Sequence, residues 1–295
     1  MTKKLLALGL SLTMALSLAA CGGNSGSSAS GSSSNTDAST SQADASASTG
    51  DTSTATGGKL VMGTSADYPP FEFHILDENG EDQIVGIDVF LGEQIAEDMG
   101  MEFEVVHMDM NFDNLLVLMA QGDCDMVLAA MESTPERLNA ADCSDPYYTD
   151  LPPVIVTKAE NADQYTSLDD FNGKSVGAQT GTTKAAIITE QMTGATPVLL
   201  TTVGDLINQL VYDKCDAVVL DGAVANKYVE SNPDLAIVDS ISLGDSMEPY
   251  RVWVAKGDPK GLLDDINASI AKMTQEDALV DFIDKANELS SQAMA

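Results

Sequence analysis

The stretch Lys174-Ser-Val-Gly-Ala-Gln-Thr-Gly-Thr-Thr-Lys-Ala-Ala-Ile-Ile-Thr-Glu-Gln-Met192 predicts a strand followed at once by a helix. The strand covers residues 174–179, and the helix runs from Thr182 to Met192. The same order repeats on both sides of this stretch. Further strands are predicted over 59–65, 102–108, 125–130, 154–157, 198–201, 216–220, 235–238 and 250–255, and further helices over 88–99, 112–121, 204–213, 223–231, 262–273 and 278–289. Alternating strands and helices indicate an α/β fold with mostly parallel sheets.

The acidic segment Asp77-Glu-Asn-Gly-Glu-Asp82 separates two more predicted strands, over 71–75 and 83–85. Its Asn-Gly pair favours the positive φ angles of a tight turn, so we predict a β-hairpin here. A calcium-binding loop is the other interpretation of such an acidic cluster. The segment lacks the ligand spacing of that loop and its closing Glu, so the turn is preferred.

The first 58 residues differ in composition from the rest of the chain. Two lysines precede an apolar run over 5–20, which matches a secretory signal and is short for a membrane-spanning helix. The run ends in Leu18-Ala-Ala-Cys21, which resembles a bacterial lipobox, so we expect a signal peptide over 1–20 and lipid on Cys21. A plain secretion signal with an incidental cysteine is the alternative. Residues 22–58 contain only small and polar residues and are expected to form a disordered tether.

The chain is strongly acidic, because 46 Asp and Glu residues against 14 Lys and Arg residues give a formal net charge of −32 over 295 residues. Nearly all of this charge lies in residues 59–295, since the first 58 hold only two lysines and three aspartates. Nucleic-acid binding is therefore not expected, because neutralising phosphates needs clustered Lys and Arg. Docking on an anionic membrane through protein charge is disfavoured for the same reason. With 44% hydrophobic residues, the chain can still bury a core.

Catalytic signatures are absent from the sequence: there is no His-Glu-x-x-His, Gly-x-Ser-x-Gly, P-loop or Gly-x-Gly-x-x-Gly segment. The segment Thr180-Gly-Thr-Thr-Lys184 superficially suggests a phosphate loop but lacks the required spacing. The only two histidines, His74 and His107, stand on predicted strands and are expected at the surface or the edge of the core. We therefore expect no enzymatic activity, no metal and no cofactor.

Four cysteines are present, and one of them is Cys21. The other three, Cys124, Cys143 and Cys215, are odd in number, so at most one internal disulfide can form. Each stands at the start of a predicted strand, where buried free thiols are common. We expect free thiols rather than a Cys124–Cys143 disulfide.

Eight segments carry a recognisable combination of residues, in a fixed order along the chain. They are Gly63-Thr-Ser-Ala-Asp-Tyr-Pro-Pro-Phe-Glu-Phe73, Ile84-Val-Gly-Ile-Asp88, Phe112-Asp-Asn-Leu-Leu116, Thr134-Pro-Glu-Arg137, Cys143-Ser-Asp-Pro-Tyr-Tyr148, Val176-Gly-Ala-Gln-Thr-Gly-Thr-Thr183, Asp216-Ala-Val-Val-Leu-Asp221 and Glu248-Pro-Tyr250. Together they resemble the bacterial extracellular solute-binding proteins of polar amino-acid ABC transporters. Any one segment is a weak signal, but the ordered set is specific and spans nearly all of residues 59–295.

The resemblance implies a two-lobed periplasmic-binding-protein fold of type II, in which two crossover strands join two α/β lobes around a ligand. It places the crossovers near 149–154 and 239–248. Lobe one is then residues 59–152 plus 245–295, and lobe two is residues 153–244.

The resemblance also implies roles for five residues. Arg137 matches the arginine that clamps the ligand carboxylate, as a planar guanidinium can. Thr183 begins a helix whose N-terminus can share that carboxylate, and Asp221 matches the aspartate that binds the ligand ammonium. Tyr68 and Phe112 match two aromatics that enclose the ligand side chain. Plainer interpretations are core aromatics for Tyr68 and Phe112, a capping or surface ion pair for Arg137, and a helix cap for Asp221.

Four further positions complete the expected binding set: Ser65, Ala130, Glu132 and Gln179. Ser65 stands where relatives that bind Lys, Arg or ornithine often carry Asp or Glu, which argues mildly against a basic ligand. Glu132 stands where Thr or Ser usually helps to hold the ammonium. Either Glu132 points elsewhere, or its carboxylate contacts a cationic side chain and partly replaces the acid missing at Ser65.

The expected function is that of a receptor that delivers a polar amino acid to an ABC transporter permease by closing two lobes around it. We expect a monomer outside the cytoplasmic membrane, anchored only by lipid on Cys21, with a zwitterionic ligand favoured. One alternative is an enzyme similar to cyclohexadienyl dehydratases, which resemble these binding proteins and would use Glu132 as acid or base. Another alternative is a sensor that passes ligand occupancy to a signalling partner.

Overall fold

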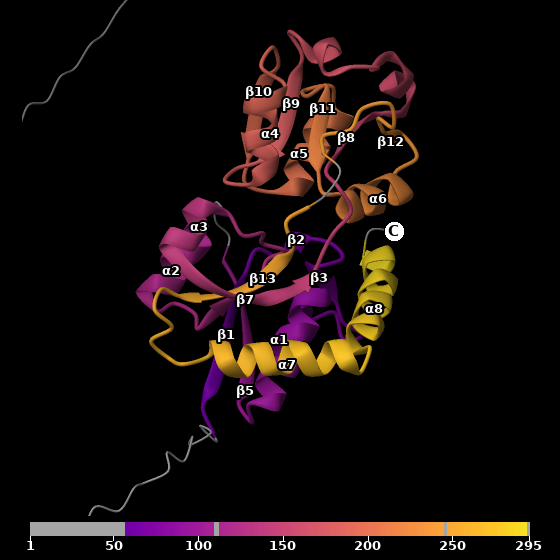
Figure 1. Ribbon diagram of the computed structural model, residues 1–295. Helices are drawn as coiled ribbons and strands as arrows, with labels where there is room; N and C mark the ends of the chain where they lie inside the picture. Colours follow the sequence, from indigo (N-terminus) through magenta and orange to yellow (C-terminus); the bar gives the residue numbers. More distant parts are fainter. Residues whose placement is uncertain (1–56, 109–111, 245–246, 294–295) are drawn as a thin grey trace, which may run out of the picture. The chain divides into compact units, whose positions relative to one another are not determined.

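Two five-stranded sheets, each with flanking helices, form the framework of the protein (Figure 1). The computed structural model describes residues 57–108, 112–244 and 247–293, which all belong to one unit, Thr52–Ala295. The predicted signal peptide, Cys21 and residues 22–56 of the tether lie outside the described residues. We call the part built on the first sheet lobe one and the part built on the second sheet lobe two.

Lobe one is built from strands at both ends of the folded chain. Its sheet has the order β5-β1-β6-β13-β7, and an antiparallel sheet of β2, β3 and β4 lies beside it. The strands are β1 (Lys59–Thr64), β2 (Asp67–Tyr68), β3 (Glu72–Leu76), β4 (Asp82–Val85), β5 (Glu102–His107), β6 (Met126–Val127), β7 (Ala141–Tyr148) and β13 (Tyr250–Ala255). The helices are α1 (Ile87–Asp98), α2 (Asn114–Gln121), α3 (Pro135–Ala140), α7 (Leu263–Gln275) and α8 (Ala278–Ala293).

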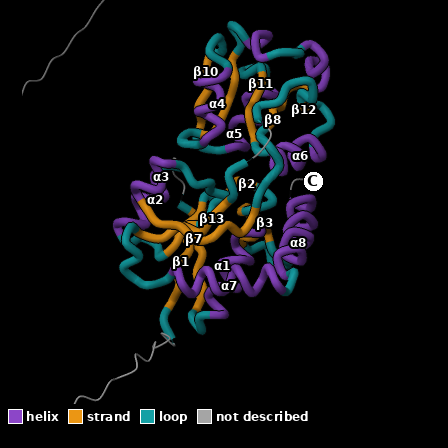
Figure 2. Tube along the Cα trace, viewed as in Figure 1, coloured by secondary structure: helices purple, strands orange, loops and turns teal. Residues whose placement is uncertain are grey.

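Lobe two uses one continuous stretch of the chain, between β7 and β13. Its sheet has the order β10-β9-β11-β8-β12. The strands are β8 (Val154–Lys158), β9 (Ser175–Gln179), β10 (Thr196–Leu200), β11 (Ala217–Leu220) and β12 (Leu235–Ile237). The helices are α4 (Thr183–Gln191), α5 (Val203–Val211), α6 (Gly222–Ser231) and the 3-10 turns η1 (Ala159–Gln164) and η2 (Leu168–Phe171). Figure 2 shows helices and strands distributed through both lobes, as expected for the α/β class.

The prediction of mostly parallel sheets was wrong, because both sheets are mixed. Strand β1 pairs in parallel with β5 and β6, but β13 is antiparallel to both β6 and β7. In lobe two, β9 pairs in parallel with β10 and β11, but β8 is antiparallel to β11 and β12. The antiparallel strands are those beside the two connections between the lobes. A chain that leaves one lobe on β7 and returns on β13 runs through that sheet in opposite directions.

The hairpin at residues 72–85 is confirmed. Strands β3 and β4 pair in antiparallel register from Phe73 with Val85 to Leu76 with Asp82. Gly80 has a φ of +81° in the connecting turn, and the carboxylate of Asp77 accepts from the N–H groups of Asn79 and Glu81. These contacts explain the acidic cluster as turn chemistry.

The core of each lobe lies between its sheet and its helices. The fully buried Trp253, on β13, donates from its indole nitrogen to the carbonyl of Met131 at 3.2 Å, which satisfies the one polar atom of the side chain. Cys124, Cys143 and Cys215 carry free thiols, as expected. Among the described helices, we find none with the length and apolar composition needed to span a membrane.

Candidate functional site

A short helix in lobe one positions the guanidinium of Arg137. The side chain of Thr134 caps α3 by accepting from the backbone N–H of Arg137 at 3.2 Å, and Pro135 stands at the first helical position. The side chain of Arg137 is buried, and its guanidinium lies over the ring of Phe112, 5.0 Å from the ring centroid. Its Nη2 donates to the carbonyl of Gly181 in lobe two at 3.1 Å. Arg137 therefore links the two lobes directly.

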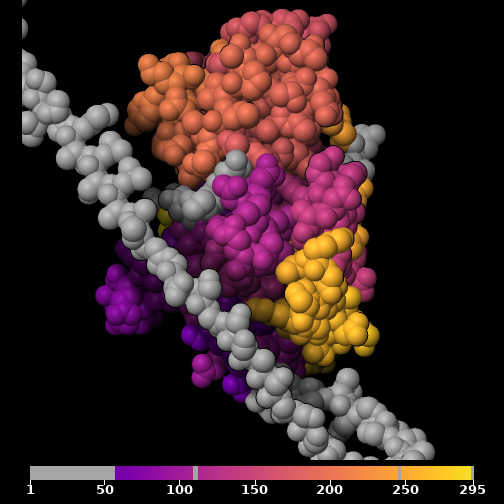
Figure 3. All heavy atoms as spheres, turned by 90° about the vertical axis from the view of Figure 1, so that its left-hand side faces the viewer, coloured from indigo at the N-terminus to yellow at the C-terminus, as the bar shows by residue number. Residues whose placement is uncertain are grey.

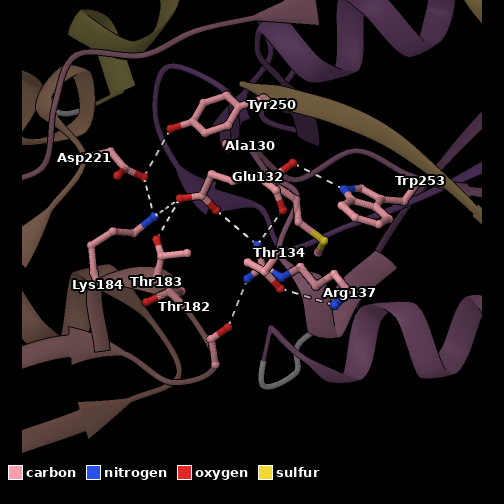
Figure 4. Close-up of polar contacts among 12 residues, drawn as sticks. Ala130, Glu132, Thr134, Arg137, Thr182, Thr183, Lys184, Asp221, Tyr250 and Trp253 are labelled. Atoms are coloured by element: carbon pink, nitrogen blue, oxygen red, sulfur yellow. Dashed lines mark hydrogen bonds and ion pairs between the residues drawn. The ribbon is translucent and has the colours of Figure 1, made fainter. Parts of the chain in front are cut away.

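The carboxylate of Glu132 lies between the two lobes and is held by three side chains (Figure 4). Arg137 donates from Nη1 to Oε2 of Glu132 at 3.1 Å, and the hydroxyl of Thr183 donates to Oε1 at 2.8 Å. The ammonium of Lys184 donates to the same Oε1 at 2.8 Å. Burial alone would raise the pKa of Glu132, but the positive charges of Lys184 and Arg137 outweigh it and lower the pKa to about 2. Glu132 is therefore a carboxylate at neutral pH.

The ammonium of Lys184 joins Glu132 to Asp221. Lys184 is the second residue of α4, is only 5% exposed, and donates to Oδ2 of Asp221 at 2.7 Å. The hydroxyls of Tyr68 and Tyr250 donate to the same oxygen, at 2.6 and 3.1 Å. Burial would lower the pKa of Lys184, but Asp221 and Glu132 raise it above its usual value. The lysine therefore remains charged in this buried position.

A small cavity of about 10 Å³ lies beside these ion pairs. It is lined by Ser65, Asp67, Tyr68, Glu72, Phe112, Ala129, Ala130, Gln179, Lys184 and Asp221. Asp67 closes one side of it by accepting from the N–H of Val203, at the N-terminus of α5, at 2.7 Å. Burial raises the pKa of Asp67 to about 6. Figure 3 shows atoms of lobe one (magenta) packed against atoms of lobe two (salmon) on one face of the molecule.

Two of the carboxylates that line the cavity are incompletely satisfied. Oε2 of Glu72 and Oδ1 of Asp221 are buried and accept no hydrogen bond within the described part of the chain. Burial, followed by the nearby charges of Asp88 and Asp67, raises the pKa of Glu72 well above its usual value. An unpartnered buried acceptor is costly, so the cavity is suited to a group that donates several hydrogen bonds.

All nine residues of the expected binding set lie in this region. Six line the cavity itself: Ser65, Tyr68, Phe112, Ala130, Gln179 and Asp221. The other three, Glu132, Arg137 and Thr183, form the cluster of contacts around Lys184. Asp221 occupies the N-cap position of α6 but makes no side-chain cap bond, which disfavours its interpretation as a helix cap.

Three residues of the site were missed from the sequence: Asp67, Glu72 and Lys184. Asp67 and Glu72 are in the segment Gly63–Phe73, but nothing in the sequence distinguished them, as binding residues, from the residues that only shape the turn of this segment. Lys184 directly follows Thr183, in a segment considered only as a phosphate loop. Glu132 did carry an indirect signal for Lys184. Together with Asp221 it places two carboxylates near the one ammonium of the ligand, which requires a second cation, and residues 59–295 contain few Lys and Arg residues that could supply it.

The buried carboxyl group of Asp88 gives a pH-dependent stability that can be measured. Asp88 accepts from the N–H of Ala130 and the hydroxyl of Tyr147, and burial raises its pKa to about 7. Between pH 4 and 7 the folded chain keeps a proton that unfolded Asp88 has released, so the free energy of unfolding falls as the pH rises. The Asp88→Asn variant should lose up to about 1.4 kcal/mol per pH unit of this dependence in urea unfolding at pH 5, 6 and 7.

The control for this experiment is Asp142→Asn. Asp142 accepts from Lys256, and this hydrogen bond lowers its pKa, so it is ionised in both states over this range. The control should keep the pH dependence of the wild type. An unchanged slope in the Asp88→Asn variant would show that Asp88 does not hold the proton.

Comparison with known proteins agrees with this architecture. The pattern that defines the bacterial extracellular solute-binding proteins, family 3, matches residues 60–286. The arginine-binding extracellular protein ArtP of Bacillus subtilis (strain 168) is 39% identical over 183 residues, which are 60% of this chain and 66% of that protein. The ABC transporter arginine-binding protein 1 of Escherichia coli (strain K12) is 28% identical over 214 residues, covering 72% and 84% of the two chains.

Solved structures give the same result. The amino acid ABC transporter substrate-binding protein AbpA of Streptococcus pneumoniae Canada MDR_19A, bound to L-arginine, superposes with a TM-score of 0.74 at 33% identity. The match covers 79% of this chain and 96% of AbpA. The two-lobed fold is thus that of a periplasmic binding protein, as predicted.

The chain belongs to the bacterial extracellular solute-binding proteins, family 3. It is an extracytoplasmic solute-binding protein of the kind that serves ABC transporters, and the relatives described above are named as binding proteins.

Proposed function

We propose that this protein is the receptor of an ABC importer for a cationic amino acid, with L-arginine as the favoured ligand. The observation that carries this proposal is a set of three carboxyl groups around the cavity: that of the half-buried Asp67, and those of the buried Glu72 and Asp221, which each have one unpartnered oxygen. A guanidinium supplies five N–H donors and a positive charge, and so matches acceptors of this kind. Glu72 and Asp67 would then supply the acid that is missing at Ser65. This replaces the earlier expectation of a zwitterionic ligand.

The relatives support the same class of ligand. Two curated relatives are named as arginine-binding proteins, and AbpA was solved with L-arginine. In our proposal, Arg137 and Thr183 bind the ligand carboxylate, Asp221 binds its ammonium, and Tyr68 and Phe112 enclose its side chain. Ser65, Ala130 and Gln179 complete the lining of the site, and Glu132 lies beside the ligand headgroup.

The wider proposal concerns how the receptor works and where it is held. Closure of lobe one (59–152 plus 245–295) on lobe two (153–244) would stabilise a liganded form that the permease recognises. Lipid on Cys21 would anchor the monomer to the outer face of the cell membrane, with residues 22–58 as a tether.

The test is a panel of ligands in thermal-shift assays and calorimetry. L-Arginine at 100 times its Kd should raise the free energy of unfolding by about 2.7 kcal/mol. L-Citrulline is the matched control, because it has nearly the same shape as arginine without the charge, and it should bind far more weakly. L-Lysine, L-ornithine, L-glutamine, L-cystine and L-glutamate complete the panel.

Two results would contradict the proposal. Citrulline or glutamine binding as tightly as arginine would remove the case for a cationic ligand. A panel in which no amino acid stabilises the protein would contradict the receptor itself.

A further inference from the structure

The Glu132 and Lys184 side chains together present a carboxylate and an ammonium at the centre of the site. Oε1 of Glu132 and Nζ of Lys184 are 2.8 Å apart, and both side chains are almost fully buried. Arg137 and Thr183 hold the carboxylate, and Asp221 holds the ammonium (Figure 4). These two charged groups are also the two that every free amino acid carries.

The proposed function assigns the same three partners to the ligand. In it, Arg137 and Thr183 bind the ligand carboxylate, and Asp221 binds its ammonium. We propose, on the basis of that function, that the Glu132–Lys184 pair occupies the subsite of the ligand headgroup and competes with the ligand for it.

The space that remains supports a competition rather than joint occupancy. The cavity of about 10 Å³ is no larger than one water molecule requires. An amino-acid headgroup can reach Arg137 and Asp221 only if the Lys184 ammonium and the Glu132 carboxylate move apart. Separating Glu132 from Lys184 costs free energy, and this cost reduces the apparent affinity of the protein for the ligand.

The pair also links the two lobes in the way that a ligand would. Glu132 belongs to lobe one, between β6 and α3, whereas Thr183, Lys184 and Asp221 belong to lobe two. The bonds from Thr183 and Lys184 to Glu132 thus hold the lobes together from within the chain. These bonds therefore favour the closed arrangement before a ligand is bound, and they oppose the opening that lets a ligand enter.

The experiment is the double variant Glu132→Thr/Lys184→Gln, which removes one charge of each sign and so keeps the net charge. L-Arginine should bind it at least tenfold more tightly than it binds the wild type in calorimetry. Small-angle scattering should show a larger radius of gyration for the ligand-free variant than for the ligand-free wild type. The matched control is Glu104→Thr/Lys59→Gln, which makes the same replacements at an exposed ion pair of lobe one and should change neither quantity.

The possible results separate this inference from the proposed function. Tighter binding by the double variant, or binding by the double variant alone, supports the inference. If the wild type binds arginine and the double variant binds no more tightly, the inference is overturned and the proposed function stands. If neither protein binds any amino acid of the panel, both are overturned.

A measurement on the wild type keeps the test valid even if the double variant does not fold. The ligand-free wild type should populate the closed form in part, so that its radius of gyration is smaller than that of an open two-lobed molecule and decreases further with saturating L-arginine. A ligand-free wild type that is fully open, and that closes only when arginine is added, would contradict the inference.

Discussion

The Arg137→Ala variant should bind L-arginine roughly 2–5 kcal/mol more weakly than the wild type, which is the effect of removing one partner of a buried charged hydrogen-bonded pair. Arg137 is only 7% exposed and is the one arginine whose guanidinium is in contact with Glu132, Gly181 and Phe112. Without it, the carboxylate of a bound amino acid would lie in the site with its charge largely uncompensated. Isothermal titration calorimetry at neutral pH measures the loss directly.

Two further variants make this result interpretable. Arg251→Ala changes the net charge by the same amount, but Arg251 donates to the carbonyl of Ser144 and does not line the cavity, so affinity should be kept. Arg137→Lys retains the charge and loses the planar pair of donors, so its affinity should fall between those of the wild type and Arg137→Ala. Wild-type affinity in a folded Arg137→Ala protein would exclude Arg137 as the carboxylate clamp.

The three charged or polar residues that were selected from the sequence each stand next to the start of a helix or the end of a strand. Arg137 follows a Thr-Pro helix start, Thr183 begins α4, and Asp221 directly follows β11. Each of these positions can be read from a few neighbouring residues. For that reason these three residues could be selected from their own short segments, even at α3, where the helix itself was not predicted.

Lys184 could not be identified in the same way, because its partners are distant in sequence. Its ammonium meets Glu132, 52 residues earlier, and Asp221, 37 residues later. Helix spacing predicts only that Lys184 follows Thr183 near a helix N-terminus, where a positive charge is not favoured by the helix dipole. Two buried carboxylates from different segments outweigh that preference, and they become neighbours only when the lobes meet.

The fold was predicted best where elements are long and periodic. Helix α3 spans six residues and was missed, because it is shorter than two turns and shows no apolar repeat. Strand β7 was predicted only as a strand start at Cys143 and without bounds, because it contains Asp142, Asp145 and Pro146, which are rare in strands. Pro146 is tolerated because β7 is an edge strand of its sheet, where one side of the backbone needs no partner strand.

The excess of acidic residues also has a more specific meaning in the site than in the sequence. At the sequence level, the charge of −32 argued only against polyanionic partners. Around the cavity, the described residues offer four carboxyl groups (Asp67, Glu72, Glu132 and Asp221) and two positive charges (Arg137 and Lys184). Burial raises the pKa of Glu72 well above its usual value, so Glu72 stays neutral until a cation lies beside it. A cationic side chain would reduce this local imbalance, whereas a glutamate ligand would increase it.

The Gly86→Ala variant should lose roughly 3–5 kcal/mol of its free energy of unfolding, since it combines backbone strain with a steric clash. Gly86 has a φ of +137° and a ψ of 178°, a region that only glycine occupies readily. An added Cβ would also lie 2.1 Å from the carbonyl oxygen of Phe71. That carbonyl accepts from the N–H of Asp88 and directly precedes Glu72, so a shift here would displace a carboxylate of the cavity.

Gly80→Ala separates the two causes. Gly80 also has a positive φ, of +81°, but a Cβ there would meet no other atom within 4 Å. It should therefore lose only about 1–2 kcal/mol, the cost of a left-handed conformation in a residue with a side chain. Urea unfolding of both variants at one pH makes the comparison. Equal losses would mean that the backbone around Phe71 moves aside freely. A much larger loss for Gly86→Ala would mean that the backbone around Phe71, next to Glu72, is held rigidly against Gly86.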